Sequence, residues 1–99
     1  MTSDVIGPGE LKLVSAWSPG RDVSGEVEEV LRANVRPEDI RRLWDATFLV
    51  YTEASQAEIR DWLAQRLREG DGVFVAAFER WSSWGRASDH RAWLLRRGH

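Results

Sequence analysis

Three stretches of the chain show the pattern of apolar and polar positions that is typical of β-strands. Residues 11–17, LKLVSAW, alternate between two fairly apolar faces. Residues 47–52, TFLVYT, and 73–78, VFVAAF, are short apolar runs rich in β-branched and aromatic residues. Because the run 47–52 is apolar along almost its whole length, we expect it to be a central strand of a sheet.

A period of 3.6 residues predicts two helices between these strands. The first covers about residues 23–33, where apolar residues recur at positions i, i+3 and i+4. The second covers about 55–69 and begins at Ser55 and Glu58, which have the spacing of a capping box. Gly70 is expected to end this helix, because glycine readily adopts the left-handed conformation found after helix ends.

The segment 35–45, VRPEDIRRLWD, has a less certain pattern. Pro37 followed by two acidic residues suits the first turn of a helix, and Ile40, Leu43 and Trp44 fall at helical spacing. The local sequence therefore favours a short helix, while an edge strand is the alternative that the surrounding fold would require.

The order of these elements predicts an α+β protein with a ferredoxin-like, two-layer sandwich, in which both helices lie on one face of a small sheet. The strands 47–52 and 73–78 are joined through a helix, so they are expected to run parallel. We expect a flexible lead over residues 1–9, one α+β domain over 10–79 and a tail over 80–99.

The tail differs from the rest of the chain in charge and in aromatic content. Residues 80–99 contain five arginines and one acid, a charge of +4, so residues 1–79 carry −6 of the total of −2. The chain also has six tryptophans, more than one small core is expected to bury. The residues proposed for an interaction surface are Trp17, Trp81, Trp84, Trp93, Arg80, Arg86, Arg91, Arg96 and Arg97.

A tail of this composition has two interpretations. Arginine interleaved with tryptophan suits single-stranded nucleic acid, through phosphate contacts and base stacking. The favoured interpretation is that the indoles pack on the sheet or on a partner, while the arginines pair with acids such as Glu28, Glu29 or Glu53. The tail would then cover the face of the sheet that the helices leave open, across a homodimer.

The sequence contains little that predicts catalysis or cofactor binding. With no cysteine, disulfides and thiolate metal sites are excluded. Asp22, Asp45 and Asp71 lie near expected strand ends, but their spacing predicts caps and turns rather than a shared metal ion. His90 and His99 are expected to be solvated residues of the tail. We predict no catalytic residue, no metal site and no cofactor.

The same sequence gives an expectation for the location of the protein. No apolar run approaches the roughly 20 residues that cross a membrane, and the first ten residues, MTSDVIGPGE, do not have the pattern of a signal peptide. A cysteine-free chain suits a reducing compartment. We therefore expect a cytoplasmic protein without a membrane partner.

Residues 44–85, WDATFLVYTEASQAEIRDWLAQRLREGDGVFVAAFERWSSWG, resemble small ferredoxin-like proteins related to the CRISPR-associated adaptation endonuclease subunit. The resemblance implies a homodimer formed by two sheets, with nucleic-acid binding or divalent-metal nuclease activity. In nuclease members an aspartate closes the first strand. Here that strand ends in SAWSPG, and the first acid after it is Asp22, so the resemblance does not extend to the metal site.

Together these observations predict a non-enzymatic, homodimeric interaction or regulatory module whose partner is a second copy or another protein. The alternative is a nucleic-acid-binding protein or metal-dependent nuclease related to that family. A third alternative is a ligand-binding protein or small enzyme that uses a cleft between sheet and helices.

Overall fold

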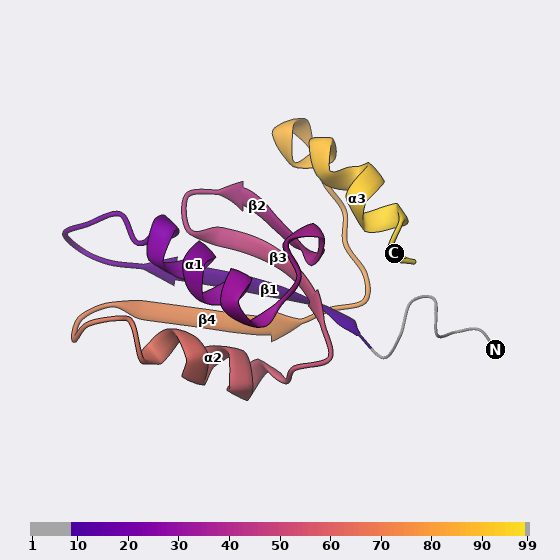
Figure 1. Cartoon of the computed structure of the whole chain (residues 1–99). Coiled ribbons are helices and arrows are strands. Elements are labelled where there is room, and N and C mark those ends of the chain that lie inside the picture. The colour runs from indigo at the N-terminus through magenta and orange to yellow at the C-terminus, as the bar shows by residue number, and fades with distance from the viewer. Residues whose placement is uncertain (1–8, 99) are drawn as a thin grey trace.

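The computed structural model describes residues 9–98 and shows a small α+β protein with a four-stranded antiparallel sheet (Figure 1). The elements are β1 (Glu10–Trp17), α1 (Ser24–Asn34), the 3₁₀ turn η2 (Pro37–Asp39), β2 (Ile40–Trp44), β3 (Thr47–Thr52), α2 (Gln56–Ala64), β4 (Gly72–Ala77), the 3₁₀ segment η3 (Gly85–His90) and α3 (Arg91–Leu95). The predicted α+β class is confirmed. The flexible lead expected over residues 1–9 lies outside the described residues, apart from Gly9.

The strands lie in the order β2-β3-β1-β4, and each neighbouring pair is antiparallel. Ser15 of β1 pairs with Thr47 of β3 on one side and with Phe74 of β4 on the other. Because β3 and β4 are both antiparallel to β1, they run in the same direction, as strands joined through a helix usually do. They are not neighbours, since β1 lies between them.

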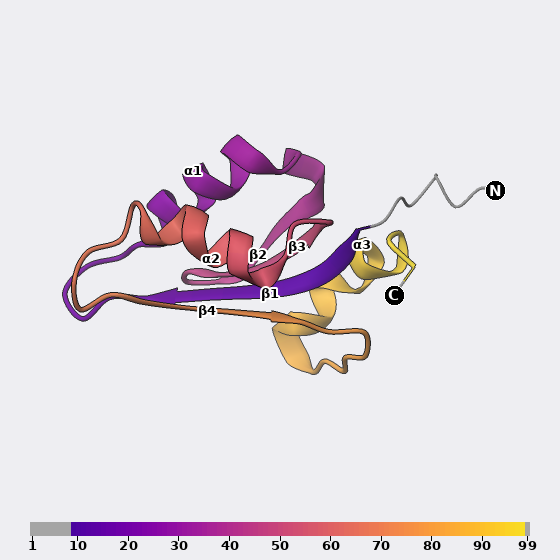
Figure 2. The ribbon, with the colours of Figure 1, turned by 90° about the horizontal axis from the view of Figure 1, so that it is seen from below.

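Helices α1 and α2 cover one face of the sheet, as Figure 2 shows, and the main core lies between these two layers. Val14, Phe48 and Val50 point from the sheet into this core, where they meet Val27 of α1 and Ile59 of α2. All five side chains are completely buried. Each such burial stabilises the fold by about 1.5–3 kcal/mol relative to an exposed side chain.

Helix α2 begins as the sequence predicts and ends earlier. The hydroxyl of Ser55 accepts a hydrogen bond from the backbone N–H of Glu58, 3.1 Å away, and the Glu58 carboxylate accepts from the N–H of Ser55 at 2.8 Å. The helix ends at Ala64 rather than at residue 69. Beyond Ala64, the backbone N–H groups of Arg66 and Leu67 both donate to the carbonyl oxygen of Leu63, as is common in the last turn of a helix.

Of the two alternatives for residues 35–45, the short helix is wrong beyond Asp39 and the edge strand is confirmed from Ile40 to Trp44. Pro37 begins only the single turn η2, and the chain from Ile40 onward is an edge strand paired with β3. Ile40 pairs with Val50 and packs against the main core, so pairing with a distant strand outweighs the local preference. A register shift and Asp45, which has a φ of 45°, then turn the chain into β3.

Candidate interaction surface

The C-terminal tail covers half of the sheet face that α1 and α2 leave open. Figure 2 shows η3 and α3 on the side of the sheet opposite the other two helices. Trp93 and Leu94 of α3 are each only 4% exposed and form a second apolar cluster with Leu11, Leu49 and Tyr51 of the sheet. Of the tail residues proposed from the sequence, Trp93 therefore packs on the sheet of its own chain.

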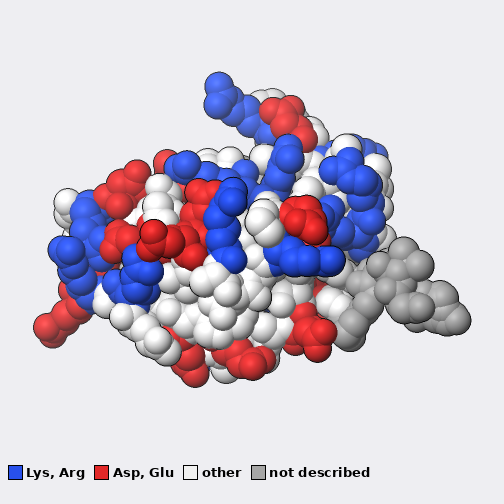
Figure 3. Space-filling view, in the orientation of Figure 1, with Lys and Arg blue, Asp and Glu red and all other residues white. Residues whose placement is uncertain are grey.

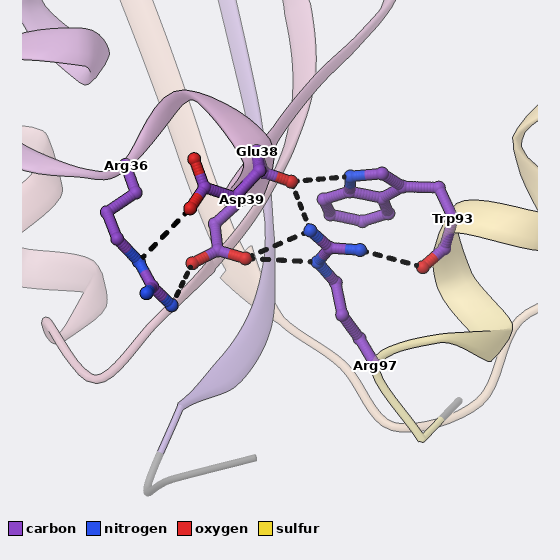
Figure 4. Close-up of polar contacts among 5 residues, drawn as sticks. All are labelled: Arg36, Glu38, Asp39, Trp93 and Arg97. Carbon is purple, nitrogen blue, oxygen red and sulfur yellow. Dashed lines mark hydrogen bonds and ion pairs between the residues drawn. The ribbon is translucent and has the colours of Figure 1, made fainter. Parts of the chain in front are cut away.

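A polar network holds the end of the tail against η2, and Figure 4 shows it in detail. The guanidinium of Arg97 donates to one carboxylate oxygen of Asp39 at 3.0 and 3.2 Å, and to the backbone carbonyl of Glu38. The same guanidinium lies 4.1 Å from the ring centre of Trp93, whose indole N–H donates to the Glu38 carbonyl at 2.9 Å. Arg36 binds the other oxygen of Asp39 at 3.1 Å.

His90 forms a second contact between the tail and the sheet. Its Nδ1 accepts a hydrogen bond from the Nε of Arg41 in β2, 2.8 Å away. Burial and then the charge of Arg41 lower the pKa of His90, and the nearby Asp89 only partly opposes this. The expectation of a solvated tail histidine is therefore wrong for His90, which is half-buried and bonded to Arg41. His99 lies outside the described residues.

The other half of this sheet face is uncovered among the residues that the structure describes. Trp17 is 63% exposed, Phe74 is 64% exposed and Trp44 is 51% exposed. They lie around the paired residues Ser15 and Thr47, whose hydroxyls are 3.0 Å apart, on the face opposite α1 and α2. We call Trp17, Trp44 and Phe74 the aromatic patch. Large apolar patches of this kind mark interaction sites in soluble proteins.

Four of the five tail arginines have no ion-pair partner within residues 9–98. They are exposed, whereas Arg97 is paired. The expectation that tail arginines pair with Glu28, Glu29 or Glu53 is wrong for these three acids. Glu28 and Glu29 bind Arg32 and Arg66 of the helical layer, and the acid that a tail arginine does bind within residues 9–98 is Asp39. The unpaired residues are Arg80, Arg86, Arg91 and Arg96. In Figure 3 basic side chains gather around the tail, while acidic ones lie along the opposite rim beside α2.

Two of these arginines line an open hollow of about 570 Å³ in the tail. Its walls come from Arg80, Trp81, Ser82, Ser83, Arg91 and Leu95. Trp81 is partly buried and packs against the apolar cluster under α3. Trp84, by contrast, is 91% exposed, so the three tail indoles have very different surroundings.

The acids considered as metal ligands have separate structural roles. Asp22 accepts a hydrogen bond from the N–H of Ser24 at the start of α1, which lowers the pKa of the carboxyl. Asp71 accepts from Ser18, from the N–H of Arg68 and from Arg21, so the pKa of its carboxyl is also lowered. Across the described part of the chain, no three His, Asp or Glu residues come together as a metal site would require.

Sequence reasoning missed two features of this surface. The exposed Phe74 and Trp44 were not among the residues proposed, although the open sheet face was expected to need a cover. The signal for Phe74 was present, because it alternates with Val73 and Val75, which face the helices. For Trp44 there was no such signal, since its segment was expected to be helical.

Within residues 9–98, no helix is long and apolar enough to cross a membrane. The resemblance of residues 44–85 to relatives of the CRISPR-associated subunit stays a prediction. No protein-family model matches the chain, and neither the curated proteins nor the solved structures contain a significant match to it.

Proposed function

We propose that this chain is a non-enzymatic, homodimeric interaction module with a ferredoxin-like fold. The order of elements, two β-α-β halves in which β1 and β3 pair at the centre of the sheet, supports the ferredoxin-like assignment. The aromatic patch is the observation on which the functional proposal depends.

The patch is costly to leave in water. Full burial of one large apolar side chain contributes about 1.5–3 kcal/mol, and Trp17, Phe74 and Trp44 each expose more than half of their surface. Most other large apolar side chains within residues 9–98 are already buried in the two clusters, so few are left to cover the patch. A second copy presents the same patch, so a two-fold axis lets both copies bury it together.

Charge supports a second copy as the partner. The tail carries +4 and residues 1–79 carry −6, and the exposed tail arginines do not neutralise acids of their own chain among the described residues. A dimer can place the basic tail of one copy against the acidic body of the other. Such complementarity favours association in one defined orientation.

Sedimentation equilibrium at tens of micromolar tests the proposal. We expect the unmodified protein to be a dimer. The double variant Trp17→Ser/Phe74→Ser is expected to raise the dissociation constant about a thousandfold, because four exposed aromatics per dimer lose their burial. Its far-ultraviolet circular dichroism should not change.

The control is Leu95→Ser, which removes an exposed apolar side chain of the tail. This variant is expected to remain dimeric, because Leu95 lies outside the aromatic patch. A monomeric unmodified protein would contradict the proposal, and so would a double variant that dimerises normally.

The second candidate function is binding of single-stranded nucleic acid. It is favoured by the four unpaired tail arginines together with Trp84, whose 91% exposed indole is available for base stacking. Fluorescence anisotropy with a labelled oligonucleotide at low salt tests it, with Trp84→Ala and Arg86→Ala expected to weaken binding. The same mixture with Mg²⁺ or Mn²⁺ shows whether the oligonucleotide is cleaved. Absence of binding by the unmodified chain would eliminate this candidate.

A further inference from the structure

The two edges of the sheet differ in how they are protected against pairing with another strand. Strand β2 is short, contains Arg41 and Arg42, and has a register shift before Trp44. Strand β4, GVFVAA, has no charged residue and no proline, and it pairs with β1 in an unbroken register. Natural proteins usually protect an edge strand with charge, proline or a bulge, and β4 has none of these devices.

Backbone pairing shows which groups of β4 face outward. Phe78 donates its N–H to the carbonyl of Leu11 at 3.1 Å, which extends the pairing of β4 with β1. Because hydrogen-bonded pairs alternate along antiparallel strands, every second residue of β4 turns its backbone groups toward β1. The outward-facing residues are therefore Val73, Val75 and Ala77. No other strand of residues 9–98 lies beyond them.

We infer that two copies of this chain join through their β4 strands, antiparallel and across a two-fold axis, to form one continuous eight-stranded sheet. The inference rests on the homodimer proposed above and specifies how it is built. With Val75 opposite Val75 of the other copy and Val73 opposite Ala77, all outward-facing residues of both strands are paired. This register forms about six new backbone hydrogen bonds.

The surface beside β4 is not filled by α2. A hollow of about 300 Å³ runs between β4 and α2, lined by Gln56, Ala57 and Arg60 of the helix and by residues 73–75 of the strand. An identical strand is uncharged and has the same length. Pairing with an identical strand therefore places no unpaired charge at the centre of the joint. An extended peptide of another sequence could carry a charge there.

The same register brings the aromatic patch to the joint. Phe74 lies opposite Ala76 of the other copy, on the face away from α1 and α2. Gly72, which pairs with Trp17, lies opposite Phe78 of the other copy. The segment after Phe78 leads into the tail, so the tail of each copy enters beside the aromatic patch of the other. Pairing of the two edges would therefore also cover part of the aromatic patch.

Charged residues at the two ends of β4 specify the orientation. Glu69 precedes the strand and Arg80 follows it; both are exposed, and no ion pair joins either to another residue within 9–98. In the antiparallel joint, Arg80 of one copy lies beside Glu69 of the other. Because the dimer is two-fold symmetric, this contact occurs twice in it.

Charge reversal with mixing tests this contact. Arg80→Glu alone and Glu69→Arg alone each place like charges together at both contacts. Each is therefore expected to raise the dissociation constant of the dimer about tenfold. In a one-to-one mixture, both contacts of the mixed dimer are attractive. We expect mixed dimers to form and to be identified by native mass spectrometry, with an affinity near that of the unmodified protein.

Matched controls are Arg96→Glu and Glu53→Arg, which make the same charge changes at exposed sites away from β4. Mixing them is expected to give a much weaker preference for mixed dimers than mixing the Arg80 and Glu69 variants, because neither site lies at an end of β4. Ala77→Pro is a second probe, because it removes an outward-facing N–H without breaking a bond to β1. It is expected to give a folded monomer.

The outcomes separate the two proposals. A monomeric unmodified protein overturns both the homodimer and the edge pairing. A dimer that is broken by Trp17→Ser/Phe74→Ser, but shows no preference on mixing and survives Ala77→Pro, overturns only the edge pairing. Mixed dimers formed preferentially from the Arg80 and Glu69 variants support it.

Discussion

Arg97 makes most of the polar contacts that hold the tail against η2. It binds Asp39, the carbonyl oxygens of Glu38 and Trp93, and the indole face of Trp93. The side chains of Arg97 and Asp39 are each only 12% exposed. Ion pairs that are this well shielded depend on both partners, because removal of one leaves a charge poorly solvated.

Replacing Arg97 with alanine is expected to lower the free energy of unfolding by about 2 kcal/mol, because Asp39 loses two charge-assisted hydrogen bonds. Urea denaturation at a fixed protein concentration measures the change. Amide hydrogen exchange should accelerate in α3 more than in β3, since the variant loosens the tail.

Arg96→Ala is the matched control for this prediction. Arg96 is exposed and forms no ion pair with residues 9–98, so its removal should change stability by less than about 0.5 kcal/mol. Equal effects of the two substitutions would show that the network does not stabilise the tail.

At the level of single residues, the sequence was informative only where partners are close along the chain. The capping box of Ser55 and Glu58 could be predicted because its two residues are three apart. Arg97 could not be distinguished from the other tail arginines, because Asp39 lies 58 residues away in the sequence.

Among the elements, η3 and the edge strand β2 are joined by the hydrogen bond from Arg41 to His90. Only a neutral His90 can accept this bond. The pKa of His90 is lowered from 6.5, so the unfolded chain binds this proton more readily than the folded one does. The contribution to stability is complete above pH 6.5 and is lost as the pH falls below it.

We therefore expect the melting temperature to fall between pH 7 and pH 5, before most carboxylates titrate. In His90→Gln the decline over this range should be smaller, because the glutamine oxygen accepts from Arg41 at every pH. Differential scanning calorimetry of both proteins measures the difference. Parallel pH profiles would show that the Arg41–His90 contact does not respond to pH.

The sequence predicted elements well where their patterns are local. Residues 47–52 match β3 from end to end, and the expected strands at 11–17 and 73–78 differ from β1 and β4 by one residue at their ends. The segment 35–45 could not be assigned to a helix or to a strand from its sequence, because nothing within it specifies pairing with β3. Pro37 and its acidic neighbours favour a helical turn, and the strand is stabilised by Val50 and the core.

For the whole molecule, the sheet has one face covered by two helices and one face half covered by the tail (Figure 2). Six tryptophans in 99 residues already predicted more apolar surface than the chain would bury. The sequence could not predict which tryptophans are buried, as Trp93 is, and which belong to the exposed patch. That division depends on which part of the sheet the tail packs against.

The position of Arg97 has a consequence for how the protein could be altered after synthesis. Proteolysis that removes Arg97 would take away the link between α3 and η2. The cluster of Leu11, Leu49 and Tyr51 would then lose part of its cover, so cleavage at a single place would enlarge the apolar surface of the open sheet face.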